Sequence, residues 1–244
     1  MEKHLHKLFA DLENHHWWSV GIRQIQLFFV KKYLPVPFPE ILDIGCGPGA
    51  TLKELSKLGH TIGIDNSKYA LQLAKQRGLK NIRYGDVLHL PFSENSFHIV
   101  TAFDVIEHVD DDIKGLMEIK RVMKKGGIVI FTSPAYMWLY DDHDRMNHHF
   151  RRYTTRKFIE KAKNLGLNVR FCTYCNTFLF PFIVLVKVFN RIRGMSRFNN
   201  EDTPEPLNSI LKLIFSSERY VLNMVPFPFG LSILAVLEKP LNEG

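Results

Sequence analysis

A glycine-rich loop between an apolar run and a helix-like run is the feature that most constrains the fold. The stretch reads EILDIGCGPGATLKELSKLGH, residues 40–60, with glycine at positions 45, 47 and 49. Glycine has no side chain and adopts positive φ freely, so such a loop lets a ligand approach the main chain. A strand, a glycine loop and a helix in this order predict a ligand-binding turn in an α/β domain.

Strand-like and helix-like segments alternate after residue 39, which predicts a mostly parallel sheet flanked by helices. Gly59 and Gly78 are expected to end the first two helices. The gap at about 177–227 is too long for a loop and predicts a helical insertion, with helices near 178–192 and 208–224 and a polar, mobile link over 194–208. The expected strands are 40–45, 60–65, 81–86, 96–104, 127–134, 167–176 and 230–239, and the other helices are 51–59, 67–78, 110–127 and 154–166.

Composition and charge narrow the class of protein. The start of the chain is too charged for a secretory signal, and no apolar run reaches the roughly 20 residues of a membrane span. Three cysteines indicate no disulfide framework, and Cys172 and Cys175 fall on opposite faces of a strand, which disfavours a metal or redox role. We therefore expect a soluble, cytoplasmic protein. The net charge of +7 indicates either a solvated basic face or attraction for an anionic partner.

Acidic residues stand at the ends of the first three strands. Asp65 ends the second strand, where a carboxylate can accept both hydroxyls of a ribose, and Asp86 ends the third strand on the same edge of the sheet. Asp43 lies two residues before Gly45 and would oppose a pyrophosphate held by the helix N-terminus. The set favours an adenosine-bearing ligand with a positive charge, and S-adenosylmethionine has this chemistry.

Four segments carry a family resemblance over roughly residues 40–135. LDIGCGPG, GIDNS, GDVLHLPFSENSFHIVTAFDVIEHV and IKRVMKKGGIVIFTSP resemble the class I S-adenosylmethionine-dependent methyltransferases, in the ubiquinone/menaquinone-methyltransferase-like (type 11) branch. The resemblance implies a Rossmann-like α/β fold, with a seven-stranded, mostly parallel sheet whose last strand is antiparallel. It also implies a methyltransferase domain over 39–244, preceded by an N-terminal helical lid over 1–38.

The resemblance further implies roles for individual residues around the cofactor. The three loop glycines would approach the methionine part with Cys46 among them, and Asp43 would orient the loop or the amino group. Trp18 and Arg23 would contact the cofactor from the lid; the alternative is that Trp17 and Trp18 merely pack against the sheet. The cofactor-binding set is Asp43, Gly45, Cys46, Gly47, Gly49, Asp65, Asn66, Asp86, Val87, Phe103, Asp104, Trp18 and Arg23.

The segment YDDHDRMNHHFRRYT, residues 140–154, is long enough to reach over an acceptor. One interpretation takes His143, His148 or His149 as the proton acceptor and Arg151 or Arg152 as the holder of an anionic group, beside Tyr153 and His108. A second is a network of arginine–aspartate pairs that pins the segment. A third is a metal site, but the spacing of the histidines with Asp144 matches no standard motif, so no metal is assigned. Glu107 and His108 would either cap the helix at Asp110 or face the acceptor.

The residues after the fourth strand narrow the acceptor class. The sequence there is DVIE, without the Asn/Asp-Pro-Pro-Tyr/Phe of base methylases or the Pro-Cys of RNA cytosine enzymes. Nucleic acid is therefore disfavoured, and O- or N-methylation of a small-molecule or lipid-linked acceptor is expected. The apolar run 176–189 is either the core of a cap or a surface for peripheral membrane contact. A non-catalytic S-adenosylmethionine-binding protein and a nicotinamide-dependent oxidoreductase stay as alternatives.

Overall fold

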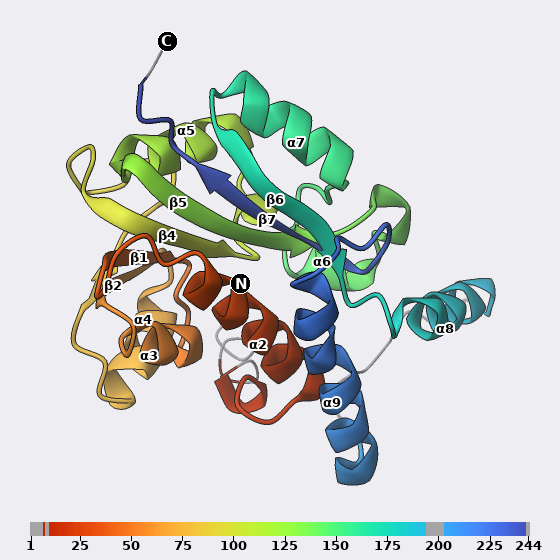
Figure 1. Cartoon of the computed structure of the whole chain (residues 1–244). Coiled ribbons are helices and arrows are strands. Elements are labelled where there is room, and N and C mark those ends of the chain that lie inside the picture. Colours follow the sequence, from red (N-terminus) through yellow and green to blue (C-terminus); the bar gives the residue numbers. More distant parts are fainter. Residues whose placement is uncertain (1–6, 8–9, 194–202, 243–244) are drawn as a thin grey trace.

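Seven strands form one mixed sheet in the order β3-β2-β1-β4-β5-β7-β6 (Figure 1). The computed structural model describes residues 7, 10–193 and 203–242. Strand β7 runs antiparallel to both of its neighbours, and the other pairs are parallel, so the predicted fold is confirmed. The strands are β1 (Glu40–Ile44), β2 (His60–Asp65), β3 (Ile82–Tyr84), β4 (Phe97–Phe103), β5 (Met123–Pro134), β6 (Asn168–Cys175) and β7 (Ser232–Glu238).

Helices cover both faces of this sheet (Figure 1). Apolar residues of α5 and α7 pack with one face in a buried cluster, and those of α2 and α9 pack with the other. Helix α8 projects away from the body of the molecule. The helices are α2 (Trp17–Lys32), α3 (Ala50–Leu55), α4 (Lys68–Gln76), α5 (Asp112–Val122), α6 (Asp142–Met146), α7 (Thr155–Asn164), α8 (Phe180–Ile192) and α9 (Glu205–Leu222), with single 3₁₀ turns η1 (Ile106–His108) and η2 (Met137–Leu139).

Helix α2 is a layer of the sheet domain. Its predicted apolar stripe is real, since Ile25 and Phe29 are fully buried against the sheet. The backbone N–H of Trp17 donates to Asn208 Oδ1 at 2.7 Å, which holds α2 against α9. The lid over residues 1–38 stays a prediction, but residues 17–32 pack as part of the core.

Four predicted boundaries differ from the structure by three residues or more, and one of them is the end of α5, which lies at Val122 and not at 127. Helix α3 ends at Leu55 with Ser56 as its C-cap, and Gly59 instead serves close packing, since a Cβ there would lie 2.1 Å from the carbonyl oxygen of Pro39. Strand β5 begins at Met123, since this buried residue pairs with Phe97 before a shift in register. Helix α9 begins at Glu205, inside the predicted link, and residues 194–202 of that link lie outside the described residues.

The expected helix end at Gly78 is confirmed, with φ of +84°. The two cysteines of β6 also point as expected, because Cys172 packs with one buried cluster and Cys175 belongs to the other. Within the described residues, no helix is both long and apolar enough to cross a membrane.

Candidate functional site

The glycine loop joins β1 to α3 at the carboxyl edge of the sheet. Gly45, Gly47 and Gly49 all have positive φ, at +68°, +53° and +92°. A Cβ on Gly45 would lie 2.5 Å from Val105 Cγ2, and one on Gly49 would lie 2.1 Å from a methyl carbon of Leu79. A Cβ on Gly47 would meet nothing within 4 Å, so this glycine borders open space and lets a ligand approach the backbone.

Asp65, at the end of β2, holds the loop in place. Its Oδ2 accepts from the N–H of Gly47 at 2.9 Å, and its Oδ1 accepts from the N–H of Ser67 at 2.7 Å. Asp86 is exposed beyond β3, and its Oδ1 accepts from the N–H of Leu88 at 2.9 Å. Both carboxylates therefore stand at the same edge as the glycine loop, as the strand ends predicted.

Asp43 is buried behind the loop. Its Oδ1 accepts from the hydroxyl of Thr101 at 2.7 Å, and its Oδ2 has no hydrogen-bond partner among the described residues. Burial raises the pKa of Asp43 to about 7, opposed by the Thr101 hydrogen bond and assisted by the charge of Asp65. An unpaired buried oxygen beside an open glycine loop fits a ligand that carries a positive charge, and a pyrophosphate would be repelled there.

The comparisons agree with this arrangement. Residues 42–131 match the family model described as a methyltransferase domain. These residues form a methyltransferase domain. The classification as a class I S-adenosylmethionine-dependent methyltransferase, predicted from the motifs, is thereby confirmed.

Proteins of similar sequence are also methyltransferases. The chain is 30% identical over 142 residues to a ubiquinone biosynthesis O-methyltransferase of Hahella chejuensis, covering 52% of this chain and 59% of that protein. A demethylmenaquinone methyltransferase of Lactiplantibacillus plantarum is 28% identical over 174 residues, covering 59% of this chain and 70% of that protein. The match therefore spans little more than half the length of the Hahella protein.

A solved structure shows the same fold. Phosphoethanolamine N-methyltransferase 2 of Haemonchus contortus, in complex with S-adenosyl-L-methionine, superposes with a TM-score of 0.58 at 20% identity. The superposition covers 88% of this chain and 52% of that one. At this identity the likeness concerns the fold alone.

Strained backbone marks the carboxyl edge of the methyltransferase domain. Asp104 after β4, Tyr136 after β5 and Asn176 after β6 have φ of +54°, +59° and +56°. Residues with side chains rarely adopt such angles, and the strain persists where surrounding structure holds it, often at binding sites. A surface depression at the opposite edge is lined by Glu40, His60, Lys80 and Arg83, away from the glycine loop.

Two carboxylates follow β4. Glu107 is 0% exposed, and neither of its carboxylate oxygens has a hydrogen-bond partner among the described residues. Burial holds the pKa of Glu107 well above its ordinary value, and the nearby charge of Asp104 adds to this, while the Ser133 hydroxyl and the charge of Arg152 oppose it. Burial also raises the pKa of Asp104 to about 6, opposed by His149. Neither Glu107 nor His108, the two residues expected as possible caps, caps α5, because Asp111 does so by accepting from the N–H of Lys114.

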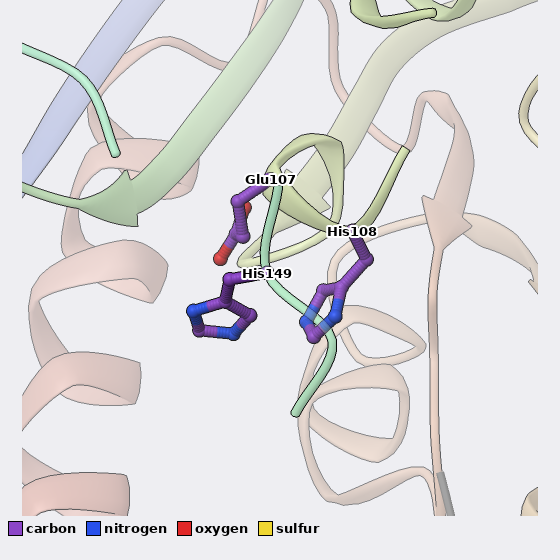
Figure 2. Close-up of side chains that lie close together, drawn as sticks. All are labelled: Glu107, His108 and His149. Carbon is purple, nitrogen blue, oxygen red and sulfur yellow. The ribbon is translucent and has the colours of Figure 1, made fainter. Parts of the chain in front are cut away.

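Two imidazoles lie beside Glu107 (Figure 2). His149 Nδ1 is 2.7 Å from Asp144 Oδ1, and His108 Nδ1 is 2.8 Å from the carbonyl oxygen of Asn147. Because both partners accept, each Nδ1 donates its hydrogen to its partner, and Nε2 is the nitrogen that keeps a lone pair when the ring is neutral. Burial and then His149 lower the pKa of His108 to about 4, so this ring is neutral at pH 7.

The other two histidines of the predicted set lie outside this cluster. His143, on α6, is exposed, and its ring contacts the side-chain amide of Asn147. His148 is exposed and sits at a φ of +56°. The structure therefore brings His149 alone, of the three candidate proton acceptors, beside Glu107 and His108.

The predicted role of the arginines needs correction. Asp144 is fully buried, and Arg152 binds it through two hydrogen bonds of 2.8 Å while only 8% of the Arg152 side chain is exposed. Arg151 lies 3.1 Å from the carboxylate of Asp112, and the Tyr153 hydroxyl donates to the same carboxylate at 2.5 Å. These three side chains are occupied within the chain, so they match the alternative network that pins the segment rather than an anion-binding site.

The N-terminal segment touches the cofactor loop through one arginine. Arg77 donates to the carbonyl oxygen of Pro48 in the loop at 3.1 Å and to that of Ala10 at 2.7 Å, and it forms an ion pair with Glu13. Arg23 donates to the carbonyl oxygen of Glu13 at 2.7 Å. The segment around residues 10–13 therefore lies beside the loop, as a lid would.

The tryptophans at the start of α2 are engaged elsewhere. Trp17 is 2% exposed and packs edge-on against Trp18 and Phe215 of α9. Trp18 also packs on Phe215. These contacts match the alternative in which the tryptophans belong to the core.

Sequence reasoning did not single out Glu218 of α9. This residue is 0% exposed, and its Oε1 accepts from the N–H of Phe178 at 2.7 Å, just beyond β6. Burial raises the pKa of Glu218 to about 7. In the sequence, a glutamate among the apolar positions of a helix indicates that this residue could be buried. That pattern does not predict which strand end the glutamate contacts.

Proposed function

We propose that this chain is an S-adenosylmethionine-dependent methyltransferase acting on a small-molecule or lipid-linked acceptor. The observation that carries the proposal is the open glycine loop, held by Asp65 and backed by buried Asp43. When bound, S-adenosylmethionine supplies a methyl group: a bond forms from the acceptor oxygen or nitrogen to the methyl carbon, the carbon–sulfur bond breaks, and its electron pair stays on sulfur. The family and the relatives described above support this assignment.

The chain's own contribution is mainly alignment. Holding two reactants in the correct geometry can lower a barrier by about 7–11 kcal/mol. An acceptor hydroxyl must also lose its proton, and the rings of His108 and His149, which lie beside the carboxylate of Glu107, are suited to accept it when they are neutral. Glu107 and His108 follow β4 directly, next to Asp104 of the predicted cofactor-binding set.

Buried polar atoms without partners among the described residues support a polar acceptor. Besides Glu107, the hydroxyl of Ser133, the side-chain amide of Asn176 and one oxygen of Glu218 are buried and unpaired in this way. Ser133 and Asn176 lie at or just beyond the ends of β5 and β6, and Glu218 contacts the chain after β6. Buried polar groups normally have partners, so a set at one edge is suited to a polar head group that supplies them.

An apolar tail on the acceptor is supported by α8. No residue of this helix is buried, and Phe182, Leu185 and Ile192 are 68%, 67% and 80% exposed. Exposed Arg191 and Arg193 stand at its end. An exposed apolar helix with basic residues is suited to the surface of an anionic bilayer. Helix α8 also contacts the segment 140–154, because Lys187 forms an ion pair with Asp141.

Release of S-adenosylhomocysteine tests the enzymatic proposal. Pools of phenolic and quinol compounds, lipids and nucleic acids would be offered separately with S-adenosylmethionine. We expect turnover with a ring-bearing small molecule or lipid, and its loss in Asp65→Ala. Donor binding without turnover on any pool would identify a non-catalytic binding protein, and turnover on nucleic acid alone would overturn the acceptor class.

Co-sedimentation with vesicles tests the membrane contact. Vesicles of phosphatidylglycerol and phosphatidylcholine should carry the protein down, and vesicles of phosphatidylcholine alone should carry down much less. Leu185→Asp on α8 should weaken binding at least fivefold. Ile113→Asp on α5, which is 48% exposed, is the matched control and should bind like the wild type. Equal binding by both variants would remove α8 from the contact.

A further inference from the structure

Glu107, His108 and His149 converge on a common space (Figure 2). One carboxylate oxygen and one nitrogen from each ring lie within 4.8 Å of one another. Ligands on opposite sides of an ion at about 2.1 Å stand about 4.2 Å apart. Small side-chain rotations therefore bring all three atoms into one coordination shell.

Both rings are oriented as metal ligands usually are. A ligating histidine nearly always donates its other N–H to a carboxylate or a carbonyl oxygen, which fixes the ring and the tautomer. His149 does this through Asp144 at 2.7 Å, and His108 does it through the carbonyl of Asn147 at 2.8 Å. These two hydrogen bonds occupy both Nδ1 atoms, so the Nε2 atom of each neutral ring is the one left to bind an ion.

Glu107 supplies an independent indication. The residue is 0% exposed, and neither carboxylate oxygen makes a well-formed hydrogen bond among the described residues, with only the nearby Ser133 hydroxyl and the charge of Arg152 to favour the ionised form. Burying an unpaired carboxylate is expensive, and protein interiors avoid it unless the group is neutral, paired or bound to a metal. Arg152 is not available as a hydrogen-bonding partner, because its guanidinium is taken by Asp144 and the carbonyl of Ala135.

We propose that Glu107, His108 and His149 bind a divalent transition-metal ion. Two imidazoles and one carboxylate suit Mn²⁺, Co²⁺ or Zn²⁺, whereas Mg²⁺ prefers shells of oxygen alone. Three protein ligands leave coordination positions open, which is typical of catalytic rather than structural sites. The spacing of the histidines in the sequence predicted no metal, because Glu107 and His108 come from η1 and only folding brings His149 to them.

A metal ion at this site also indicates which chemical group the acceptor carries, and this part of the inference rests on the proposed function. An oxygen donor on the acceptor would fill an open position, and a metal-bound hydroxyl releases its proton to water near neutral pH more readily than a free one. His149 then acts as a ligand, and the proton leaves to solvent. The acceptor would carry a hydroxyl, or neighbouring hydroxyls, at the atom to be methylated.

Metal titration of the whole chain tests the site without relying on activity. Protein stripped with a chelator and dialysed would be titrated with Co²⁺ by calorimetry and visible absorption, and with Mn²⁺, Zn²⁺ and Mg²⁺ for comparison. The wild type should bind one Co²⁺ per chain, and Mg²⁺ at least tenfold more weakly. His149→Ala and Glu107→Gln should each weaken Co²⁺ binding at least tenfold. His60→Ala, an exposed histidine at the other edge of the sheet, is the matched control.

The outcomes separate the metal proposal from the proposed function. S-adenosylhomocysteine binding, measured in the same samples, should persist in the stripped wild type and in His149→Ala, which also shows that the variant is folded. Absence of a stoichiometric Co²⁺ site in the wild type would overturn the metal proposal and leave Glu107 as a neutral buried acid. Equal loss of Co²⁺ binding in His60→Ala would overturn it as well, because the ion would then bind elsewhere.

Discussion

Asp144→Asn should destabilise the protein far more than the polar segment around it suggests. Four hydrogen bonds converge on this carboxylate: two from Arg152, one from His149 Nδ1 and one from the N–H of Asp141, all between 2.7 and 2.8 Å. The Asp144 side chain is 0% exposed and that of Arg152 is 8% exposed. Solvent therefore screens the pair very little.

The magnitude comes from this burial. Removing one partner of a buried ion pair typically costs about 3–5 kcal/mol, because the other charge stays buried and unpaired. Asparagine retains part of the hydrogen bonding, so we expect a loss at the lower end of that range, about 3 kcal/mol in the free energy of unfolding. For a chain of this size that loss lowers the melting temperature by roughly 6–12 °C.

The pH dependence gives a second readout. Burial alone would raise the pKa of Asp144, but the hydrogen bonds from His149 and Arg152 outweigh it and hold that pKa below its ordinary value. A depressed folded pKa gives stability that is complete above the unfolded pKa, about 3.9, and is lost as pH falls through the folded value. The difference between wild type and variant should therefore be steady from about pH 5 to 8 and shrink only in strong acid.

Urea unfolding followed by circular dichroism measures both effects. The matched control is Asp142→Asn, because Asp142 pairs with Arg145 on the surface, where 44% and 67% of the two side chains are exposed. An exposed pair contributes less than about 1 kcal/mol. Equal destabilisation in the two variants, or a difference that lies in the urea slope rather than the midpoint, would refute the reasoning.

Three further outcomes are expected at the site. Asp65→Ala should weaken S-adenosylhomocysteine binding by about 1.5–3 kcal/mol in calorimetry, the scale of hydrogen bonds to a charged group, and unchanged affinity would remove Asp65 from the site. Gly45→Ala should destabilise the fold more than Gly47→Ala, since both positions need positive φ but only a Cβ at position 45 meets a side chain, at 2.5 Å. Thermal melting of the two variants checks this order. Relative to its loss of stability, Gly47→Ala should show the larger loss of ligand affinity. Glu218→Gln should change the pH profile of stability, because burial raises the folded pKa of Glu218 to about 7. The folded state holds the extra proton, so the stability of the wild type falls relative to that of the variant as pH rises from about 4 to 7. Melting temperatures of the two proteins that change in parallel over that range would contradict this.

Much of the cofactor half of the site can be predicted from local sequence. Alternating apolar segments predicted the seven strands, and the positions of Gly45, Asp65 and Asp86 at strand ends predicted one shared edge. This works because neighbouring parallel strands carry their carboxyl ends to the same side of a sheet. A residue that ends a strand is thereby placed in space without any knowledge of its long-range partners.

The acceptor half depended on the tertiary structure. Sequence alone offered three equivalent histidines and two free arginines, but folding buries Asp144 among them and assigns His149 and Arg152 to it. It also sets His149 beside Glu107 and His108, which belong to a separate turn. The physical reason is that an irregular segment has no periodicity to direct its side chains, so each partner is chosen by burial and hydrogen bonding across the folded chain.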